Sequence, residues 1–312
     1  MKSKIFPLAI STFVIVMLAV HPDRYVLTSL EGLKIFALNV LPSLLPFLFF
    51  AQLLTNIGVG EKIGRFFKKP CATLYNTGGI GGYVFAMSII SGYPIGAKLV
   101  SECIKSGSIT RHEGKSILTY SSTSGPMFVL GTVGCIMLKN QSAGIIILIC
   151  HYLSSLLNGL IYRNKKRSAS IPLVSTSNNA WGESATNAVN SALLCGVYIA
   201  VFYMVAIMLK DVGIIDAVSA IFRPFLGEVS DGLVLGLIEM TGGCIALSET
   251  STPFTLPAIC AVISFGGLSV ALQSITFLGE CGIKSRYYVI SKITQSVIAF
   301  FITYLACLVF SL

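Results

Sequence analysis

The sequence predicts an all-α polytopic membrane protein built as an inverted-topology repeat with two re-entrant helical hairpins. Three observations support this fold class. Of the 312 residues, 54% are hydrophobic and only 11% are charged, whereas soluble domains average about 25% charged residues. Apolar segments follow one another almost from end to end of the chain. The order of these segments in the first half returns in the second half.

The apolar segments predict about seven full membrane spans, because a spanning helix needs about 20 mostly apolar residues. The first segment, residues 1–20, carries Lys2 and Lys4 before its apolar core, which favours an uncleaved signal-anchor helix over a cleaved signal peptide. The predicted spans are residues 5–20, 34–57, 116–138, 143–162, 189–209, 254–278 and 287–310.

Two further apolar stretches are too interrupted to span the bilayer. Residues 78–106 are broken by a Ser-Gly-Tyr-Pro-Ile-Gly sequence at 91–96, and residues 231–250 are broken by Thr241-Gly242-Gly243. Each half of a stretch holds about ten apolar residues, which give about 15 Å of helix at about 1.5 Å per residue. That length reaches only the bilayer midplane. Both stretches are therefore predicted to be hairpins that enter and leave on the same side.

The same order of features occurs twice: a span, an amphipathic segment, a hairpin and two spans. The amphipathic segments end at Lys69-Pro70 and Arg223-Pro224 and are expected to lie in the membrane interface. Three spans and a non-crossing hairpin give an odd number of crossings, so the second copy must be inverted. The predicted organisation is repeat 1 over 33–162, an inner polar linker over 163–187 and inverted repeat 2 over 188–312.

The positive charges indicate an orientation. The chain has 22 Lys and Arg against 13 Asp and Glu, a formal charge of +9, and its basic residues form short clusters between apolar segments. Such clusters are typical of cytoplasmic loops, and no basic-aromatic groove indicates nucleic-acid binding. With the N-terminus inside, sixteen of the 22 lie in inner segments, five in outer segments and one, Lys98, within the first hairpin. Lys166, Arg167 and Lys292 are counted among the inner residues. The predicted topology is N-in and C-out.

No pattern in the sequence indicates an enzyme. The nine cysteines include no CxxC pair and no Cys/His spacing that suits a metal, so they are expected to be small buried hydrophobes. No nucleophile–base constellation or Walker loop occurs. We therefore predict no cofactor, no metal and no enzymatic activity. His151 is a lone intramembrane histidine, for which a structural role is expected.

The two hairpin tips predict a binding site, because broken helices in a bilayer are tolerated only where they line a cavity or are buried in protein. Each tip begins a half-helix whose free N–H groups favour an anion. Glycines at the tips would let a ligand approach the backbone, or would only permit tight packing. The predicted substrate-binding residues are Ser91, Gly92, Tyr93, Pro94, Gly96, Lys98, Ser124, Gly125, Thr241, Gly242 and Gly243.

Small and polar residues also predict breaks in two of the spanning segments. Residues 121–126 read Ser-Ser-Thr-Ser-Gly-Pro, and Ser264, Gly266 and Gly267 occupy the related segment of the second half. One interpretation is local unwinding that exposes hydroxyl and carbonyl groups. The other is close packing of helices through small residues.

Two charged residues near the tips carry alternative interpretations. Lys98 lies one turn past the first tip, where it would bind a carboxylate or phosphate, or pair structurally with Glu102 at i+4. Glu239 lies just before the second tip. One interpretation is that Glu239 binds a coupling ion, H⁺ or Na⁺. The other is that it pairs structurally with Lys98.

Several motifs resemble those of a known family. They are Leu-Pro-Ser-Leu-Leu-Pro-Phe at 41–47, Ser-Gly-Tyr-Pro-Ile-Gly-Ala-Lys at 91–98, Ser-Gly-Pro-Met-Phe at 124–128 and Glu-Met-Thr-Gly-Gly at 239–243. These residues closely resemble the YlbJ-type sporulation integral membrane proteins, also called SpoVV, of the nucleoside recognition (Gate) family. The order of elements is similar to the core of concentrative nucleoside transporters. The resemblance extends from about residue 30 to the C-terminus.

The resemblance implies an alternating-access carrier that moves dipicolinic acid across the outer forespore membrane of sporulating bacteria. The helix N-termini and Lys98 would then meet the carboxylates of this small aromatic dianion, and Tyr93 or Phe128 would meet its ring. Two alternatives remain open. In a nucleoside transporter, amide and acidic side chains would be expected at the tips, without a cation. In a non-transporting spore-membrane assembly protein, the tips would matter only for folding. A homo-oligomer is compatible with the sequence.

Overall fold

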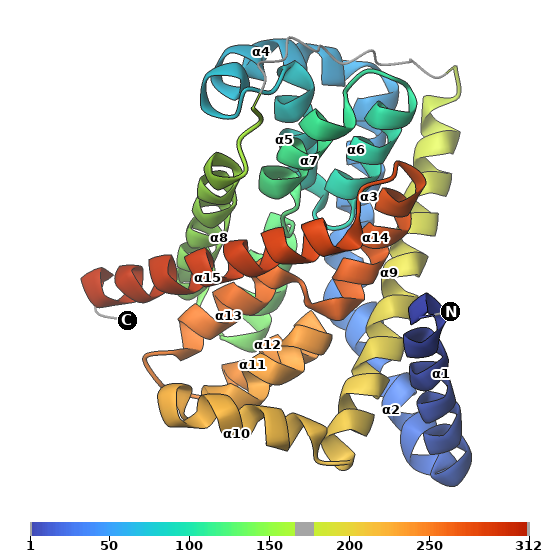
Figure 1. The fold of residues 1–312 in the computed structure, drawn as a ribbon, viewed down its shortest axis with the longest axis vertical. Coiled ribbons are helices and arrows are strands. Elements are labelled where there is room, and N and C mark those ends of the chain that lie inside the picture. Colours follow the sequence, from blue (N-terminus) through green and yellow to red (C-terminus); the bar gives the residue numbers. More distant parts are fainter. Residues whose placement is uncertain (1, 166–177, 311–312) are drawn as a thin grey trace.

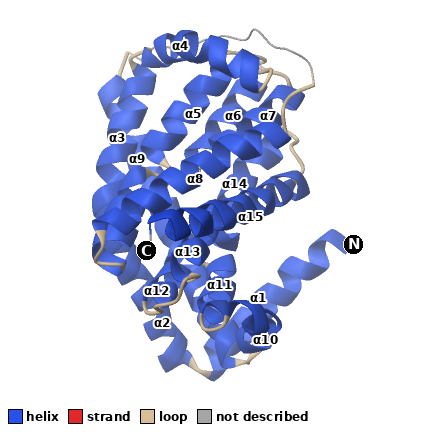
Figure 2. Ribbon diagram, turned by 90° about the vertical axis from the view of Figure 1, so that its left-hand side faces the viewer, coloured by secondary structure: helices blue, strands red, loops and turns tan. Residues whose placement is uncertain are grey.

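The fold is described from a computed structural model for residues 2–165 and 178–310. These residues form fifteen α-helices and two π-helical segments, without any strand among them (Figure 2), which confirms the predicted all-helical class. The predicted inner linker at 163–187 lies partly outside the described residues, as do Lys166 and Arg167 within it. Its placement inside the cell stays a prediction.

The helices of the two halves follow one another along the chain. The first half contains α1 (Lys2–Val20), α2 (Pro22–Ile35), the π-helical η1 (Phe36–Val40), α3 (Leu41–Asn56), α4 (Val59–Leu74), α5 (Gly79–Ser91), α6 (Ile95–Lys105), α7 (Arg111–Ser121), the π-helical η2 (Phe128–Met137) and α8 (Gln141–Ile161). The second half contains α9 (Ala180–Asp211), α10 (Ile214–Leu226), α11 (Val229–Ile238), α12 (Met240–Ser248), α13 (Thr255–Phe265), α14 (Gly267–Glu280) and α15 (Ser285–Phe310).

Side-chain caps explain where three helices begin. The side chains of Thr110, Asn140 and Asn179 accept hydrogen bonds from the backbone N–H groups of Glu113, Ala143 and Gly182. Each cap satisfies one of the N–H groups that a helix leaves unpaired in its first turn. These local interactions set the starts of α7, α8 and α9 independently of tertiary packing.

Four helical segments of the described chain are long and apolar enough to cross a membrane, or five if α1 and α2, bent by 115°, count as one span. The four are α8, α9, α13 with α14, and α15, and each matches a predicted span. The predicted span 34–57 is interrupted by η1, and the predicted span 116–138 is interrupted between α7 and η2. The number of seven full spans and the N-in/C-out topology therefore stay predictions.

Helix α15 has the residue distribution of a membrane protein. It exposes Ile290, Ile293 and Phe301, at 48–60% of their surface, while Lys292 and Gln295 are at most 1% exposed. A surface helix in water has the opposite pattern, with its apolar side buried and its polar side exposed. Lipid as the surrounding solvent explains the arrangement. Figure 1 shows α15 crossing the long axis of the molecule at mid-height.

The two amphipathic helices, α4 and α10, lie at opposite ends of the molecule (Figure 1). Phe66 on α4 is 77% exposed and Phe225 on α10 is 79% exposed, as expected for helices that insert apolar side chains into a membrane interface. Both helices run past the ends predicted for them, since Pro70 and Pro224 lie inside α4 and α10.

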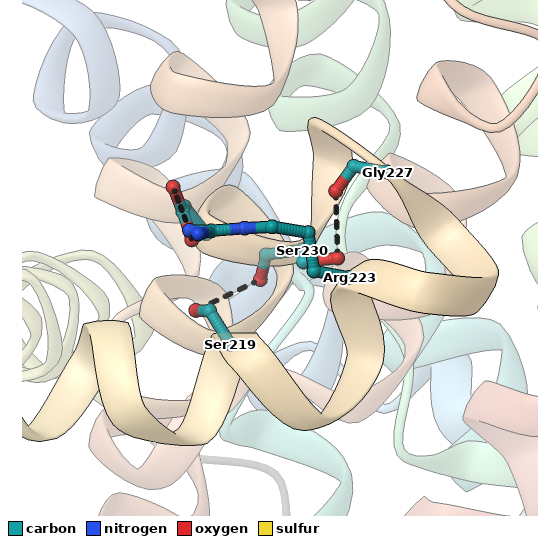
Figure 3. A network of polar contacts seen from close by, with 5 residues as sticks. Ser219, Arg223, Gly227 and Ser230 are labelled. Atoms are coloured by element: carbon teal, nitrogen blue, oxygen red, sulfur yellow. Dashed lines mark hydrogen bonds and ion pairs between the residues drawn. The ribbon is translucent and has the colours of Figure 1, made fainter.

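A polar network fixes the corner between α10 and the following hairpin helix α11. Arg223 pairs with Asp231 at 2.9 Å, and the Ser230 hydroxyl donates to the Gly227 carbonyl at 2.8 Å (Figure 3). Gly227 has φ +62° at this corner, a conformation that glycine adopts without steric cost. The corner is therefore built from local contacts that hold the amphipathic helix against the hairpin.

Candidate functional site

Both predicted hairpins contain a break. Helix α5 ends at Ser91 and α6 begins at Ile95, with Gly92 at φ +72° between them, as predicted for the first tip. The second break is the single extended residue Glu239, between α11 and α12. The prediction had placed this tip at Thr241-Gly242-Gly243, which instead form the first turn of α12. Pro94 is the residue directly before α6.

The two segments rich in small residues, both of which were predicted to span the membrane, also break, as the interpretation of local unwinding expects. Helix α7 ends at Ser121, and residues 122–125 have no helical structure before η2. Helix α13 ends at Phe265, and Gly266 turns the chain at φ +86° before α14. The structure therefore contains two pairs of breaks, one pair from each half of the chain.

A cavity of about 70 Å³ lies where the breaks meet, which is room for several water molecules. Seven of the predicted functional residues line this cavity: Ser91, Gly92, Tyr93, Ser124, Gly125, Glu239 and Thr241. Ser269 and Gln273 of α14 add polar groups, and the apolar wall comes from Val40, Leu44, Phe47, Met127, Phe128 and Ile199. Residues of both predicted tips therefore line one cavity.

Five predicted site residues do not line the cavity. Pro94, Gly96, Lys98, Gly242 and Gly243 are absent from its walls. Lys98 is half-buried on α6 and interacts electrostatically with Glu102 one turn along the helix. Its role as a substrate ligand stays a prediction, and the geometry favours the structural alternative.

Three hydroxyl groups in the cavity wall have no hydrogen-bond partner within the described chain. They belong to Ser91, Thr241 and Ser269, whose side chains are at most 2% exposed. A buried hydroxyl without a partner costs about 1–3 kcal/mol, and native proteins rarely leave one unsatisfied. Three such groups around one cavity indicate that a polar ligand or water completes the site.

Glu239 caps the helix that it precedes. Its carboxylate accepts hydrogen bonds from the N–H groups of Thr241 at 3.0 Å and Gly242 at 2.6 Å, and it is 1% exposed. Two N–H groups that were predicted to be free for an anionic ligand are therefore already bonded. A carboxylate has about four lone-pair sites, so Glu239 retains capacity for a cation, a proton or a donor in the cavity. It forms no ion pair with Lys98 among the described residues.

Lys292 is a candidate site residue that the sequence analysis places only among the inner charges. The structure buries it in α15, with 1% of its surface exposed. Its ammonium donates to the Tyr93 hydroxyl at 2.8 Å, the Ser122 carbonyl at 2.8 Å and the Gln295 side chain at 2.6 Å. The same nitrogen lies 4.8 Å from the centre of the Tyr93 ring. The spacing of Ser291, Lys292 and Gln295 on one helical face was the available sequence signal.

The Lys292 ammonium has no acidic partner among the described residues. A charge inside a bilayer costs at least a few kcal/mol, so an anion bound in the cavity would stabilise the protonated form of Lys292. Tyr93 lines the cavity and contacts the Lys292 nitrogen, whereas Lys292 itself does not line it, so Lys292 would act on a ligand there through Tyr93 rather than by direct contact.

His151 joins the two unwound segments. Its Nε2 accepts the backbone N–H of Ser124 at 3.0 Å, so Nδ1 carries the proton and donates to the Ser264 hydroxyl at 2.8 Å. The ring is fully buried. Tyr93 makes a second connection, because its hydroxyl donates to the Ile263 and Ser264 carbonyls at 3.2 and 3.3 Å. This geometry agrees with the structural role expected for His151.

Two of the predicted site glycines serve close packing. A Cβ atom at Gly96 would lie 2.2 Å from the Ser121 carbonyl oxygen, and one at Gly243 would lie 2.2 Å from the Gly236 Cα. Neither backbone neighbour can move aside easily. The packing interpretation therefore holds for these two positions, which bring α6 close to α7 and α12 close to α11.

We expect Gly243→Ala to lower the thermal unfolding midpoint of the purified protein, because the added methyl group collides with the α11 backbone. Overpacking of this kind costs about 1–3 kcal/mol. Gly279→Ala is the matched control, since nothing lies within 4 Å of its Cβ position, and it should leave the midpoint unchanged or raise it slightly. Equal midpoints for the two variants would contradict the packing role.

The fold and the cavity define a helical integral membrane protein with a buried polar site lined by three helix breaks, at 92–94, 122–125 and 239. No protein-family model and no solved structure matches the chain. A curated protein of Bacillus subtilis (strain 168), described as "Sporulation integral membrane protein YlbJ", is 28% identical over 333 aligned residues. The alignment covers 95% of this chain and 82% of that relative. This similarity supports the YlbJ-type family that the motifs predicted, and with it an integral membrane protein.

Proposed function

We propose that this protein is a sporulation-associated membrane carrier that moves a small organic anion, dipicolinic acid, across the outer forespore membrane by alternating access. The observation that carries the proposal is the central cavity with its three unpartnered hydroxyls, lined by helix breaks from both halves of the chain. The name of the relative supports the link to sporulation and to a membrane.

The position of the cavity supports a carrier rather than an enzyme. A ligand that touches both tips interacts with both halves of the molecule, so its binding changes the relative stability of their arrangements. Discontinuous helices that meet at a central site are typical of secondary transporters built from repeats. The lining offers hydrogen bonds but no nucleophile paired with a base.

The chemistry of the cavity supports an aromatic anion as substrate. Tyr93, Phe47 and Phe128 offer apolar surface for a planar ring, and the hydroxyls of Ser91, Thr241 and Ser269 can donate to carboxylates. Lys292 supplies a positive potential behind Tyr93. Glu239 is proposed as the site of the coupling ion, H⁺ or Na⁺, because its carboxylate borders the same cavity.

One observation favours a second candidate, a nucleoside carrier. Glu239 and Gln273 place an acidic and an amide group on the cavity wall, which is the combination expected for hydrogen bonds to ribose hydroxyls. Against it stands Lys292, since a neutral substrate needs no buried cation next to its site.

The proposal is tested by uptake of labelled dipicolinate into proteoliposomes under proton and sodium gradients, with unlabelled nucleosides as competitors. We expect saturable uptake that nucleosides do not inhibit. Ser269→Ala removes an unpartnered hydroxyl from the cavity wall and should raise the KM about tenfold, the effect of losing one hydrogen bond to a charged group. Ser121→Ala removes an unpartnered buried hydroxyl that lies outside the cavity, and its uptake should match that of the unmodified protein.

Three outcomes would redirect the proposal. Uptake no greater than in empty vesicles, under gradients of either sign, rejects dipicolinate transport and favours the assembly-protein hypothesis. Uptake of nucleosides instead favours the second candidate. Equal changes in the KM of uptake for Ser269→Ala and Ser121→Ala would show that the substrate does not bind in this cavity.

A further inference from the structure

A second hollow lies away from the central cavity, between the start of α7, the end of α8 and the start of α15. Its volume is about 850 Å³, much larger than that of the central cavity. We call it the basic groove. It is lined by Thr110, His112, Glu113, Lys115, Ser116, Ile161, Tyr162, Arg163, Asn164, Lys165 and Tyr287.

The charges of the basic groove favour an anion. Lys115, Arg163 and Lys165 contribute three cations, and Glu113 is the one acidic residue in the lining. The Glu113 carboxylate is 2% exposed and accepts a hydrogen bond from the Gly78 N–H at 2.8 Å, so it is turned into the protein. The excess of positive charge therefore faces the groove.

Arg163 is held in place by two hydrogen bonds and still has N–H donors that could bind a ligand. One terminal nitrogen donates to the Thr73 carbonyl at 2.7 Å and to the Asn76 side chain at 3.0 Å. A guanidinium has five N–H donors, so three remain for a ligand. Lys115 lies 5.5 Å from the centre of the Tyr287 ring, a cation–π contact that positions its ammonium at the groove.

The hydroxyl of Ser116 gives an independent sign of a ligand. Ser116 is 2% exposed and lines the groove, yet its hydroxyl has no hydrogen-bond partner within the described residues. The oxygen atoms of a phosphate would satisfy this donor together with the neighbouring cations, since charge-assisted hydrogen bonds to phosphate are among the strongest in proteins.

The location of the groove indicates the source of the phosphate. Arg163 contacts the last turn of α4, and the Asn164 N–H donates to the Tyr75 carbonyl just beyond that helix at 3.0 Å. Because α4 exposes Phe66 as an interfacial helix does, the groove opens at the depth of lipid headgroups. Tyr162 and Tyr287 pack edge to face at 5.7 Å beside it, as aromatic residues do at a membrane interface.

We propose that the basic groove binds the phosphate headgroup of an anionic phospholipid, with Lys115, Arg163 and Ser116 as its ligands. Basic pockets between helices at the cytoplasmic face of a membrane bind such headgroups. This site is separate from the central cavity and does not depend on what the carrier transports.

The test measures thermal unfolding of the full chain, purified in a neutral detergent, during titration with phosphatidylglycerol, phosphatidylcholine or inorganic phosphate. Phosphatidylglycerol should raise the unfolding midpoint saturably, whereas the other two should not. Lys115→Gln and Ser116→Ala should each need about tenfold more phosphatidylglycerol for the same rise. Without lipid, Ser116→Ala should be as stable as the unmodified chain, because it removes a buried hydroxyl that has no partner.

Lys62→Gln is the matched control, since it removes one exposed positive charge on α4 outside the groove. It should follow the unmodified titration curve. An equal response to inorganic phosphate would overturn the lipid assignment in favour of a free anion. An equal response to phosphatidylcholine, or an equal loss in Lys62→Gln and Lys115→Gln, would overturn the site itself.

Discussion

Replacing Lys292 by Met is expected to abolish dipicolinate uptake, with a fall of at least about a hundredfold in kcat/KM. The substitution keeps the length of the side chain but removes the positive charge behind the Tyr93 ring and three hydrogen bonds. Losing the attraction between a buried cation and an anionic substrate costs about 3 kcal/mol or more, which corresponds to that factor. The measurement is initial uptake in proteoliposomes, with the unfolding midpoint as a check of folding.

Two further variants separate charge from position. Lys292→Arg retains the charge and should keep part of the uptake. Lys98→Met removes a half-buried lysine of α6 that does not line the cavity, so its uptake should stay within about twofold of the unmodified protein. If Lys98→Met lost uptake and Lys292→Met retained it, Lys98 would be the anion ligand, which is one of the two interpretations that the sequence leaves open.

Replacing Glu239 by Gln is expected to uncouple transport from its driving ion. The amide keeps the size of the side chain but loses the charge that would hold H⁺ or Na⁺ at the cavity. With one proton per substrate, a gradient of about two pH units supports about a hundredfold accumulation of substrate. The variant should lose this accumulation while still exchanging dipicolinate across the membrane at equilibrium.

Glu249→Gln is the matched control for this experiment. Glu249 lies at the exposed end of α12, the helix that Glu239 caps, so its substitution should leave both accumulation and exchange unchanged. Accumulation by Glu239→Gln at the unmodified level would rule out Glu239 as the coupling site. Loss of nucleoside exchange in the same variant would support the nucleoside candidate instead.

Local chemistry determined where the helices break. Gly92 and Pro94 interrupt the first hairpin, and the small polar residues at 121–126 interrupt a spanning segment. These breaks were predictable because glycine, proline and short polar side chains weaken a helix through contacts within a few residues. The second break lies at Glu239, two residues before the predicted Thr241. The Glu239 carboxylate accepts hydrogen bonds from the first N–H groups of α12, which allows that helix to begin before the glycines.

The polar composition of the site was only partly predictable. Lys98 and Lys292 both appear in the sequence as lysines in or beside apolar segments. Each shares a helical face with polar residues, Lys98 with Ser101 and Glu102, and Lys292 with Ser291 and Gln295, so the local pattern does not favour one over the other. Ser269 and Gln273 of α14 look like ordinary polar residues of a spanning helix, although the fold turns both toward the cavity.

The sequence by itself determined the all-helical membrane class, the amphipathic helices and the positions of most breaks, because hydropathy and helix termination depend on neighbouring residues. Only the tertiary structure decided which side chains share the cavity. Lys292 reaches Tyr93 across 199 positions of the chain, and His151 reaches Ser264 across 113. Such contacts depend on how helices far apart in the sequence pack together. Rotating one helix about its axis by about 100°, the angle between successive residues, would turn a buried lysine toward the lipid.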